Sequence, residues 1–334
     1  MSTRQHEWRP LPDRRDHAFD GLRLRFSDDY EGPVEVSLLR HRSAEVASPP
    51  RRAVLWLHGY ADYFFQEHVA DVLSKSGYAF FALDLRRYGR SLMAHQTPNF
   101  CKDLSEYYPE LREAVRVIEG EGHERVTIFA HSLGGLVASN WCVDDRDDDV
   151  GAVDSLVLNS PFLASPFSTE TPARRRAMAG AVRSLAQVAP YATLPRSGVR
   201  IYGRSLHADA HGEWDYHEPW KPNDSFPVRS AWLAAVMRGQ QHLRSRLGPG
   251  VPALVLTSAR SAQLEMFSDQ ALEADLVLDV TAIRAELATW RPRPESVVLE
   301  GAVHDVTLSR REVRDRALSH VAAFLEGLDA GPSH

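Results

Sequence analysis

The sequence predicts an α/β protein with a mostly parallel central sheet, helices on its flanks and one inserted, mainly helical cap. Short continuous apolar runs alternate with segments of helical periodicity, which is typical of a parallel sheet covered on both faces. The alternation stops across residues 161–250, where helix-like segments predominate, and then resumes. We therefore expect an irregular N-terminal arm at 1–20, a core formed by 21–160 and 251–330, and a cap at 161–250.

The strands of this core are predicted from their hydrophobic patterns. Residues 22–26 and 34–39 alternate apolar and polar side chains, as half-buried strands do. The other predicted strands are continuous apolar runs, which suit buried parallel strands. These runs are residues 53–57, 78–83, 126–130, 154–159, 253–257 and 296–299.

Helices are predicted where apolar residues recur at helical spacing, and the segment 104–119 is the clearest example. Its apolar residues on one face are Leu104, Tyr108, Leu111, Val115 and Ile118. The predicted helices are residues 68–76, 104–119, 133–143, 174–188, 228–247, 280–288 and 310–325. The acidic run at 144–149 is predicted to be a solvated surface loop.

Composition and charge limit the possible functions. The chain has 334 residues, 43% of them hydrophobic, and a formal net charge of -6. A mild acidic surplus argues against nucleic acid as the main partner, since phosphate binding needs a concentrated basic face. We expect no secretory signal, no stable membrane insertion and a cytoplasmic location, because no apolar run approaches the roughly 20 residues of a membrane span. Under those conditions Cys101 and Cys142 are expected to be free thiols.

The most informative motif surrounds Ser132. The predicted strand 126–130 leads directly into His131-Ser132-Leu133-Gly134-Gly135 and then into a helical stretch. A nucleophile on a tight strand-to-helix turn needs small residues two places before and after it, and Ala130 and Gly134 meet this need. The first glycine of the usual G-x-S-x-G pattern is here alanine. Ser132 is the candidate nucleophile, with an ordinary helix N-cap as the alternative interpretation.

An oxyanion hole is predicted from the loop after residues 53–57. In this architecture two backbone N–H groups stabilise the developing oxyanion. One belongs to Leu133, which follows the nucleophile, and the other is assigned to Tyr60. Gly59 allows the backbone to approach the substrate closely, and His58 is interpreted as a packed, hydrogen-bonded loop residue.

The general base is predicted to be His304, one of 15 histidines. It follows the last predicted strand and precedes the final helix, so it lies at the carboxyl edge of the sheet, where catalytic groups collect. The acid should lie between residue 257 and His304 in the chain order Ser, Asp or Glu, His. Asp269, Asp275 and Asp279 are candidates; Asp275 is preferred, Asp279 is second, and each could instead cap a helix.

These motifs resemble the α/β-hydrolase superfamily, in particular its monoacylglycerol lipase, lysophospholipase and S33 serine aminopeptidase-like branch. The resemblance is carried by residues 55–63, 80–91, 130–135, 275–279 and 301–305. It implies an α/β-hydrolase fold, a structural role for Asp84, and Asp275 as the acid, since the first Asp of the family's D-x-x-x-D element is the catalytic one. Arg87 stands where that family has a glycine. The resemblance does not extend to the cap, so it implies no particular substrate.

The cap is rich in aromatic side chains, which either line an acyl or aromatic pocket or form the cap's own core. They are Phe162, Phe167, Tyr202, Trp214, Tyr216, Trp220, Phe226 and Trp232. His207 and His211 have the spacing of a zinc-binding pair, but Gly212 favours a loop, and the prediction is that no metal binds.

The predicted function is hydrolysis of a carboxylic ester through an acyl-enzyme, without a cofactor. The expected partner is a small-molecule ester, such as a monoacylglycerol or lysophospholipid, with an apolar acyl or aromatic part. A peptidase, thioesterase or C–C bond hydrolase would use the same groups. A non-catalytic ligand-binding protein on this scaffold, or a metal-binding regulatory cap, is the alternative from another class.

Overall fold

A computed structural model describes residues 7–11, 18–42, 50–145, 153–164, 167–194 and 199–330. Its centre is a nine-stranded sheet with the order β1-β2-β3-β5-β4-β6-β7-β8-β9. Strands β1, β2, β3 and β5 pair antiparallel, and the strands from β5 to β9 pair parallel. The strands are β1 (Arg9–Pro10), β2 (Phe19–Asp29), β3 (Gly32–His41), β4 (Arg52–Leu57), β5 (Ala79–Asp84), β6 (Arg125–His131), β7 (Val153–Asn159), β8 (Ala253–Ser258) and β9 (Glu295–Leu299).

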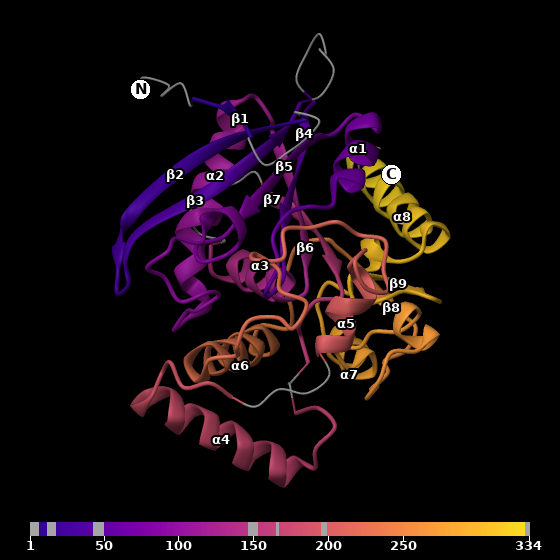
Figure 1. Ribbon diagram of the computed structural model, residues 1–334. Coiled ribbons are helices and arrows are strands. Elements are labelled where there is room, and N and C mark those ends of the chain that lie inside the picture. Colours follow the sequence, from indigo (N-terminus) through magenta and orange to yellow (C-terminus); the bar gives the residue numbers. More distant parts are fainter. Residues whose placement is uncertain are drawn as a thin grey trace.

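Helices cover both faces of this sheet (Figure 1). The described residues contain eight α-helices, which are α1 (Glu67–Lys75), α2 (Tyr108–Gly120), α3 (Leu133–Asp144), α4 (Pro172–Val188), α5 (Val199–Leu206), α6 (Ser230–Ser245), α7 (Val280–Leu287) and α8 (Arg311–Ala330). None of them has a stretch long and apolar enough to cross a lipid bilayer.

The alternation of side chains along the strands divides the core into two layers. Leu55 and Leu57 of β4 pack in one cluster with residues of α2 and α3. Trp56 points the other way and packs in a second cluster with residues of α1 and α8. Because both layers are apolar, the parallel strands read as continuous hydrophobic runs, and this is why the sequence predicts them well.

The cap helices α4, α5 and α6 follow β7 and precede β8 in the chain. Helix α6 contacts α3 of the core, whereas α4 packs against α6 and lies outermost in Figure 1. The helices predicted at 174–188 and 228–247 correspond to α4 and α6. Helix α5 was not predicted from the sequence, since its eight residues are too few to show a repeated apolar pattern.

The N-terminal arm and the acidic loop have no clear hydrophobic pattern in the sequence. The N-terminal arm is not irregular throughout, because Arg9 and Pro10 form β1 against Gly21 and Asp20 at the edge of the sheet. The Arg40 guanidinium lies over the neighbouring Trp8 ring, 4.4 Å from its centre, so the arm is held by a contact that has no sequence periodicity. Residues 146–149 of the predicted acidic loop lie outside the described residues.

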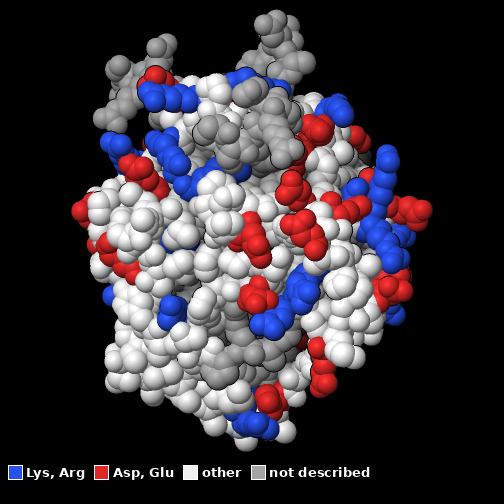
Figure 2. Space-filling model, in the orientation of Figure 1, with Lys and Arg blue, Asp and Glu red and all other residues white. Residues whose placement is uncertain are grey.

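On the face drawn in Figure 2, acidic and basic side chains are interspersed, with no single basic field among the described residues. This face therefore lacks the concentrated positive surface that phosphate backbones require.

Candidate active site

Ser132 occupies a strained turn between β6 and α3. Its backbone dihedral angles are φ 50° and ψ −113°, a conformation that non-glycine residues rarely adopt. The turn is held because the Ser132 amide donates a hydrogen bond to the Asn159 carbonyl over 3.0 Å. The strain directs the side chain to the carboxyl edge of the sheet, where parallel strands present their ligand-binding groups.

Gly134 is required for the close approach of this turn to β4. A Cβ atom at position 134 would lie 2.5 Å from the His58 carbonyl oxygen and 2.7 Å from that of Leu57. Both obstacles are backbone atoms, so neither can rotate away. The small residue that the motif predicts at this position has a direct steric cause.

The structure brings together the three side chains that the sequence selected as a catalytic group. His304 Nε2 lies 3.0 Å from Ser132 Oγ, and His304 Nδ1 lies 2.8 Å from Asp275 Oδ2. All three residues are buried. A carboxylate can only accept, so the imidazole carries its proton on Nδ1 and donates it to Asp275. Nε2 is then free to accept the hydroxyl proton of Ser132, as a general base must.

The three acid candidates have different positions. Asp275 Oδ1 accepts hydrogen bonds from the amides of Val277 and Leu278, both at 2.8 Å, which leaves Oδ2 directed at His304. Asp279 caps α7, since its Oδ1 accepts from the amides of Thr281 and Ala282.

Asp269 begins the short 3₁₀ helix Asp269–Leu272 and is exposed. Only Asp275 among the three contacts the imidazole.

The two segments that carry the predicted oxyanion-hole groups, at Leu133 and at Gly59-Tyr60, approach Ser132. Leu133 is the first residue of α3, so its amide has no acceptor within the helix. The chain of Gly59 passes so close that a Cβ there would lie 3.1 Å from the Cβ of Ser132. Tyr60 follows Gly59, and its ring packs on Trp232 of the cap at 4.1 Å between centres. The N-terminus of α3 adds a dipole that favours negative charge at this point.

His58 has a structural role. Its Nε2 accepts a hydrogen bond from the Leu85 amide over 3.0 Å, and its Nδ1 donates to the Gly59 carbonyl over 2.8 Å. Burial lowers the pKa of His58, so the ring is neutral and links the end of β5 to the loop after β4. The interpretation of His58 as a packed, hydrogen-bonded residue is confirmed.

A second buried polar network beside the triad was missed from the sequence. Asp305, the neighbour of His304, accepts hydrogen bonds through Oδ1 from Asn159 Nδ2 at 2.6 Å and from Thr307 Oγ1 at 2.6 Å. Its Oδ2 accepts from Gln66 Nε2 at 3.1 Å. Burial raises the pKa of Asp305, but the electrostatic effect of the neighbouring His131 and these hydrogen bonds outweigh it, so the pKa is lowered overall. The network anchors the loop that carries His304.

His131 and Asp62 lie beside this network. One ligand-type atom each from Asp62, His131 and Asp305 lies within 4.8 Å of the others, the arrangement of a possible metal site. The Lys221 ammonium, however, lies 2.8 Å from Asp62 Oδ1, and the Asp305 oxygens already accept from interior donors. Burial lowers the pKa of His131. The group is therefore better described as a buried polar cluster in which the Lys221 ammonium pairs with the Asp62 carboxylate.

Comparison with known families identifies the chain. Residues 48–262, more than half of the sequence, match the family described as serine aminopeptidase, S33. The chain belongs to this family. The S33 branch of the α/β-hydrolases that the sequence motifs indicated is therefore confirmed, and with it the hydrolase class and the fold. No curated relative matches the sequence.

Several solved structures share the S33 chain's fold at low sequence identity. One is monoacylglycerol lipase of Paleococcus ferrophilus, with TM-score 0.61, 16% identity and coverage of 91% of this chain and 99% of that one. A soluble variant of monoglyceride lipase from Saccharomyces cerevisiae, in complex with a substrate analog, has TM-score 0.63, 14% identity and coverage of 91% and 94%. A highly thermostable carboxyl esterase from Bacillus coagulans, in complex with glycerol, has TM-score 0.65, 13% identity and coverage of 93% and 98%.

The cap of this S33 protein is seated on the core by aromatic contacts. Trp214 Nε1 donates to the Leu308 carbonyl over 2.8 Å, and the Trp220 ring packs on Tyr63 at 5.2 Å between centres. The Tyr202 hydroxyl accepts a hydrogen bond from the Asp305 amide over 3.0 Å. These three cap aromatics thus pack on the loop that follows His304 and on the segment next to Asp62.

The two cap histidines singled out in the sequence do not form a pair. His207 lies in a turn where its Nδ1 accepts from the Asp209 amide over 3.2 Å, and its ring packs edge-on against Tyr216. His211 stacks on Phe267 instead, with 3.7 Å between ring centres. Their side chains therefore make different contacts.

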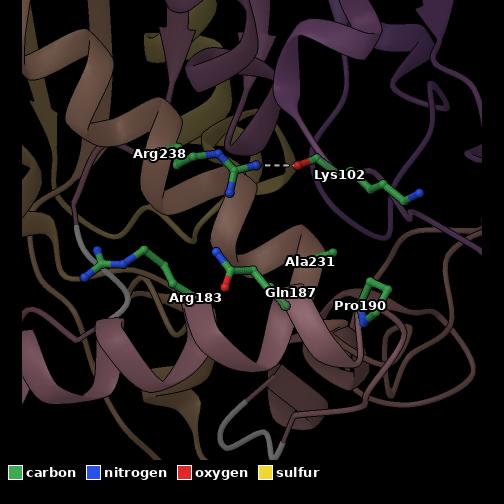
Figure 3. A pocket seen from close by; sticks show the side chains of 7 residues that line it. Lys102, Arg183, Gln187, Pro190, Ala231 and Arg238 are labelled. Carbon is green, nitrogen blue, oxygen red and sulfur yellow. Dashed lines mark hydrogen bonds between the residues drawn. The ribbon is translucent and has the colours of Figure 1, made fainter.

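A separate cavity of about 430 Å³ lies between α4, α6 and the loop before η2 (Leu104–Tyr107). Figure 3 shows its lining residues, with Arg183 and Gln187 on α4 and Arg238 on α6. Arg238 donates to the Lys102 carbonyl oxygen of the core. This cavity marks a second place where cap and core meet, and none of its lining residues belongs to the triad.

Proposed function

We propose that this protein is a serine hydrolase that cleaves carboxylic esters through an acyl-enzyme. The observation that supports it best is the chain of contacts from Ser132 Oγ to His304 Nε2 at 3.0 Å and from His304 Nδ1 to Asp275 Oδ2 at 2.8 Å. Unrelated hydrolases have converged on this arrangement, because a serine hydroxyl is a weak nucleophile until a base accepts its proton.

The first half-reaction transfers the acyl group to the enzyme. Ser132 Oγ attacks the ester carbonyl carbon while His304 Nε2 takes the hydroxyl proton, and the oxyanion is stabilised by the amides of Leu133 and Tyr60. Asp275 holds the imidazole in the required tautomer and stabilises its positive charge. The C–O bond to the alcohol then breaks, and His304 gives its proton to the leaving oxygen.

The second half-reaction uses water as the only co-reactant. His304 takes a proton from a water molecule, whose oxygen attacks the acyl carbon of the ester on Ser132. When the bond to Oγ breaks, His304 returns the proton to Ser132, and a carboxylic acid leaves. Protons and electron pairs balance over the cycle, and the triad is restored.

The proposed substrate class is a small ester with an apolar acyl or aromatic part, such as a monoacylglycerol or lysophospholipid. Two structural relatives are named as monoacylglycerol or monoglyceride lipases, and one as a carboxyl esterase. The cap segments beside the triad are rich in aromatic side chains. Aromatic side chains that line a binding site stabilise the apolar part of a bound substrate.

The test is labelling by a fluorophosphonate combined with hydrolysis of p-nitrophenyl esters of short to long acyl chains. Wild-type protein should react with the probe and hydrolyse the esters, and Ser132→Ala should do neither. Ser139→Ala is the matched control, because Ser139 lies on α3, is buried, and its Oγ has no hydrogen-bond partner among the described residues. Absence of labelling in the wild type would favour a non-catalytic binding protein. Labelling with cleavage of aminoacyl anilides but not of esters would favour a peptidase instead.

A further inference from the structure

A lysine of the cap forms a buried ion pair with the loop that carries the oxyanion donor. Lys221 Nζ lies 2.8 Å from Asp62 Oδ1, although the two residues are 159 positions apart in the chain. The side chains are 11% and 1% exposed. Two charges removed from water in this way are strongly desolvated, and apolar residues of similar volume are often at least as stable. The pair therefore calls for an explanation other than stability.

Asp62 stabilises the turn that contains Tyr60. Its second oxygen, Oδ2, lies 3.4 Å from the Gly59 amide, which donates to it. Ala61, inside the turn, has a φ of 51° and adopts the left-handed region that non-glycine residues avoid. A strained turn persists only when its surroundings hold it, and Asp62 is part of those surroundings.

Lys221 is in turn held by its own segment of the cap. Its amide donates to the carbonyls of His217 and Glu218, and its ammonium lies 5.5 Å from the centre of the Phe65 ring. The His217 amide donates to the Tyr63 hydroxyl over 2.7 Å. The cap segment 217–221 and the core segment 62–65 are thus joined by an ion pair, a hydrogen bond and a cation–π contact.

We propose that Lys221 is a positioning residue that the cap supplies to set the oxyanion loop. Its ammonium fixes Asp62, Asp62 fixes the turn of residues 59–62, and this turn places the Tyr60 amide beside Ser132. The oxyanion hole is then complete only when the segment 217–221 is seated on the core. The inference rests on the proposed ester hydrolase function and assigns a role in the reaction to a residue outside the triad and the hole.

The test compares Lys221→Met, Asp62→Asn and the double variant in the full-length protein, with kcat, KM and Tm measured for each. Lys221→Met should lower kcat by about 10- to 100-fold with little change in KM, which is less than the 10²–10³-fold typical of losing a whole oxyanion donor. Its Tm should fall, since Asp62 is left charged and buried without its partner. The double variant removes both charges, so its Tm should recover while kcat stays low.

Arg238→Met is the matched control for loss of a cap–core ion pair. Arg238 on α6 pairs with Asp103 of the core over 3.3 Å at an exposed site, and its loss should leave kcat unchanged. Recovery of kcat together with Tm in the double variant would show that Lys221 acts on stability alone and would overturn the inference, as would an unchanged kcat in Lys221→Met. If Lys221→Met does not fold, the double variant decides: low kcat at near wild-type Tm supports the role, and wild-type kcat refutes it. A wild type without esterase activity would instead refute the proposed function.

Discussion

Replacing Asp275 and Asp279 by asparagine, one at a time, separates the triad acid from the helix cap. In Asp275→Asn the amide NH₂ can face His304 Nδ1, which then becomes an acceptor and leaves the proton on Nε2. That tautomer cannot take the proton of Ser132. The equivalent change in a well-studied serine protease lowers kcat about 10⁴-fold, which corresponds to about 5 kcal/mol of lost transition-state stabilisation.

The geometry indicates that Asp275→Asn will keep its fold. An asparagine Oδ1 can still accept from the amides of Val277 and Leu278, the two bonds that orient the present carboxylate at 2.8 Å each. The Tm should therefore change little while kcat collapses. Asp279→Asn should change neither, because Asn and Asp are about equally good N-caps and the bonds to the amides of Thr281 and Ala282 are retained.

Steady-state hydrolysis of a p-nitrophenyl ester and thermal unfolding, measured on both variants, check this pair of expectations. A kcat for Asp275→Asn within about tenfold of wild type would contradict the triad assignment. A large loss in Asp279→Asn would show that the acid had been assigned to the wrong aspartate.

Three further predictions concern packing, thiol chemistry and acid stability. Gly134→Ala should abolish fluorophosphonate labelling and destabilise the protein, because its Cβ would meet the His58 carbonyl oxygen at 2.5 Å. Gly180→Ala in α4 should instead raise the unfolding free energy, measured by chemical denaturation, by up to about 1 kcal/mol, because its Cβ would meet no described atom within 4 Å. Burial raises the pKa of the Cys101 thiol to about 12, so in a Cys142→Ser background Ellman's reagent at neutral pH should react only after unfolding. The lowered pKa of Asp305 means that its carboxylate stabilises the fold above the unfolded value of about 4, and that this contribution is lost as pH falls through the folded pKa. Asp305→Asn should therefore show a smaller drop in Tm between neutral pH and about pH 3 than wild type, and an equal drop would contradict the role of this group.

The fold was predictable because its determinants are local and repetitive. Strands β4, β5, β6, β7 and β8 are buried on both faces and therefore appear as continuous apolar runs. The turn around Ser132 has a steric requirement that limits Gly134 to the smallest residue, so it leaves a short signature in the sequence. His304 could be chosen among many histidines because the topology places the loop after the last strand at the catalytic edge.

The elements that were not predicted depend on contacts between distant parts of the chain. Strand β1 has two residues and helix α5 has eight, so neither shows a repeated pattern. Spacing alone did not separate Asp275 from Asp279; Asp275 was preferred because Asp279 opens a helical stretch, as an N-cap does, and the family resemblance supported that choice. Both carboxylates accept amide hydrogen bonds from the residues that follow them. Only the position of the imidazole distinguishes their roles.

The network around Asp62, His131 and Asp305 is the most instructive of these cases. A lysine in a polar loop is expected to be solvated, and nothing near Lys221 in the sequence indicates that it is buried against a carboxylate. Each charge in the network is tolerable only because another segment supplies its partner: the cap for Asp62, and β7 through Asn159 for Asp305. Such a network favours one relative position of cap and core, since any other would leave a buried charge unpaired. Because an unpaired buried charge is unfavourable, the network can hold the loop of residues 59–62 and the loop that carries His304 in one relative position.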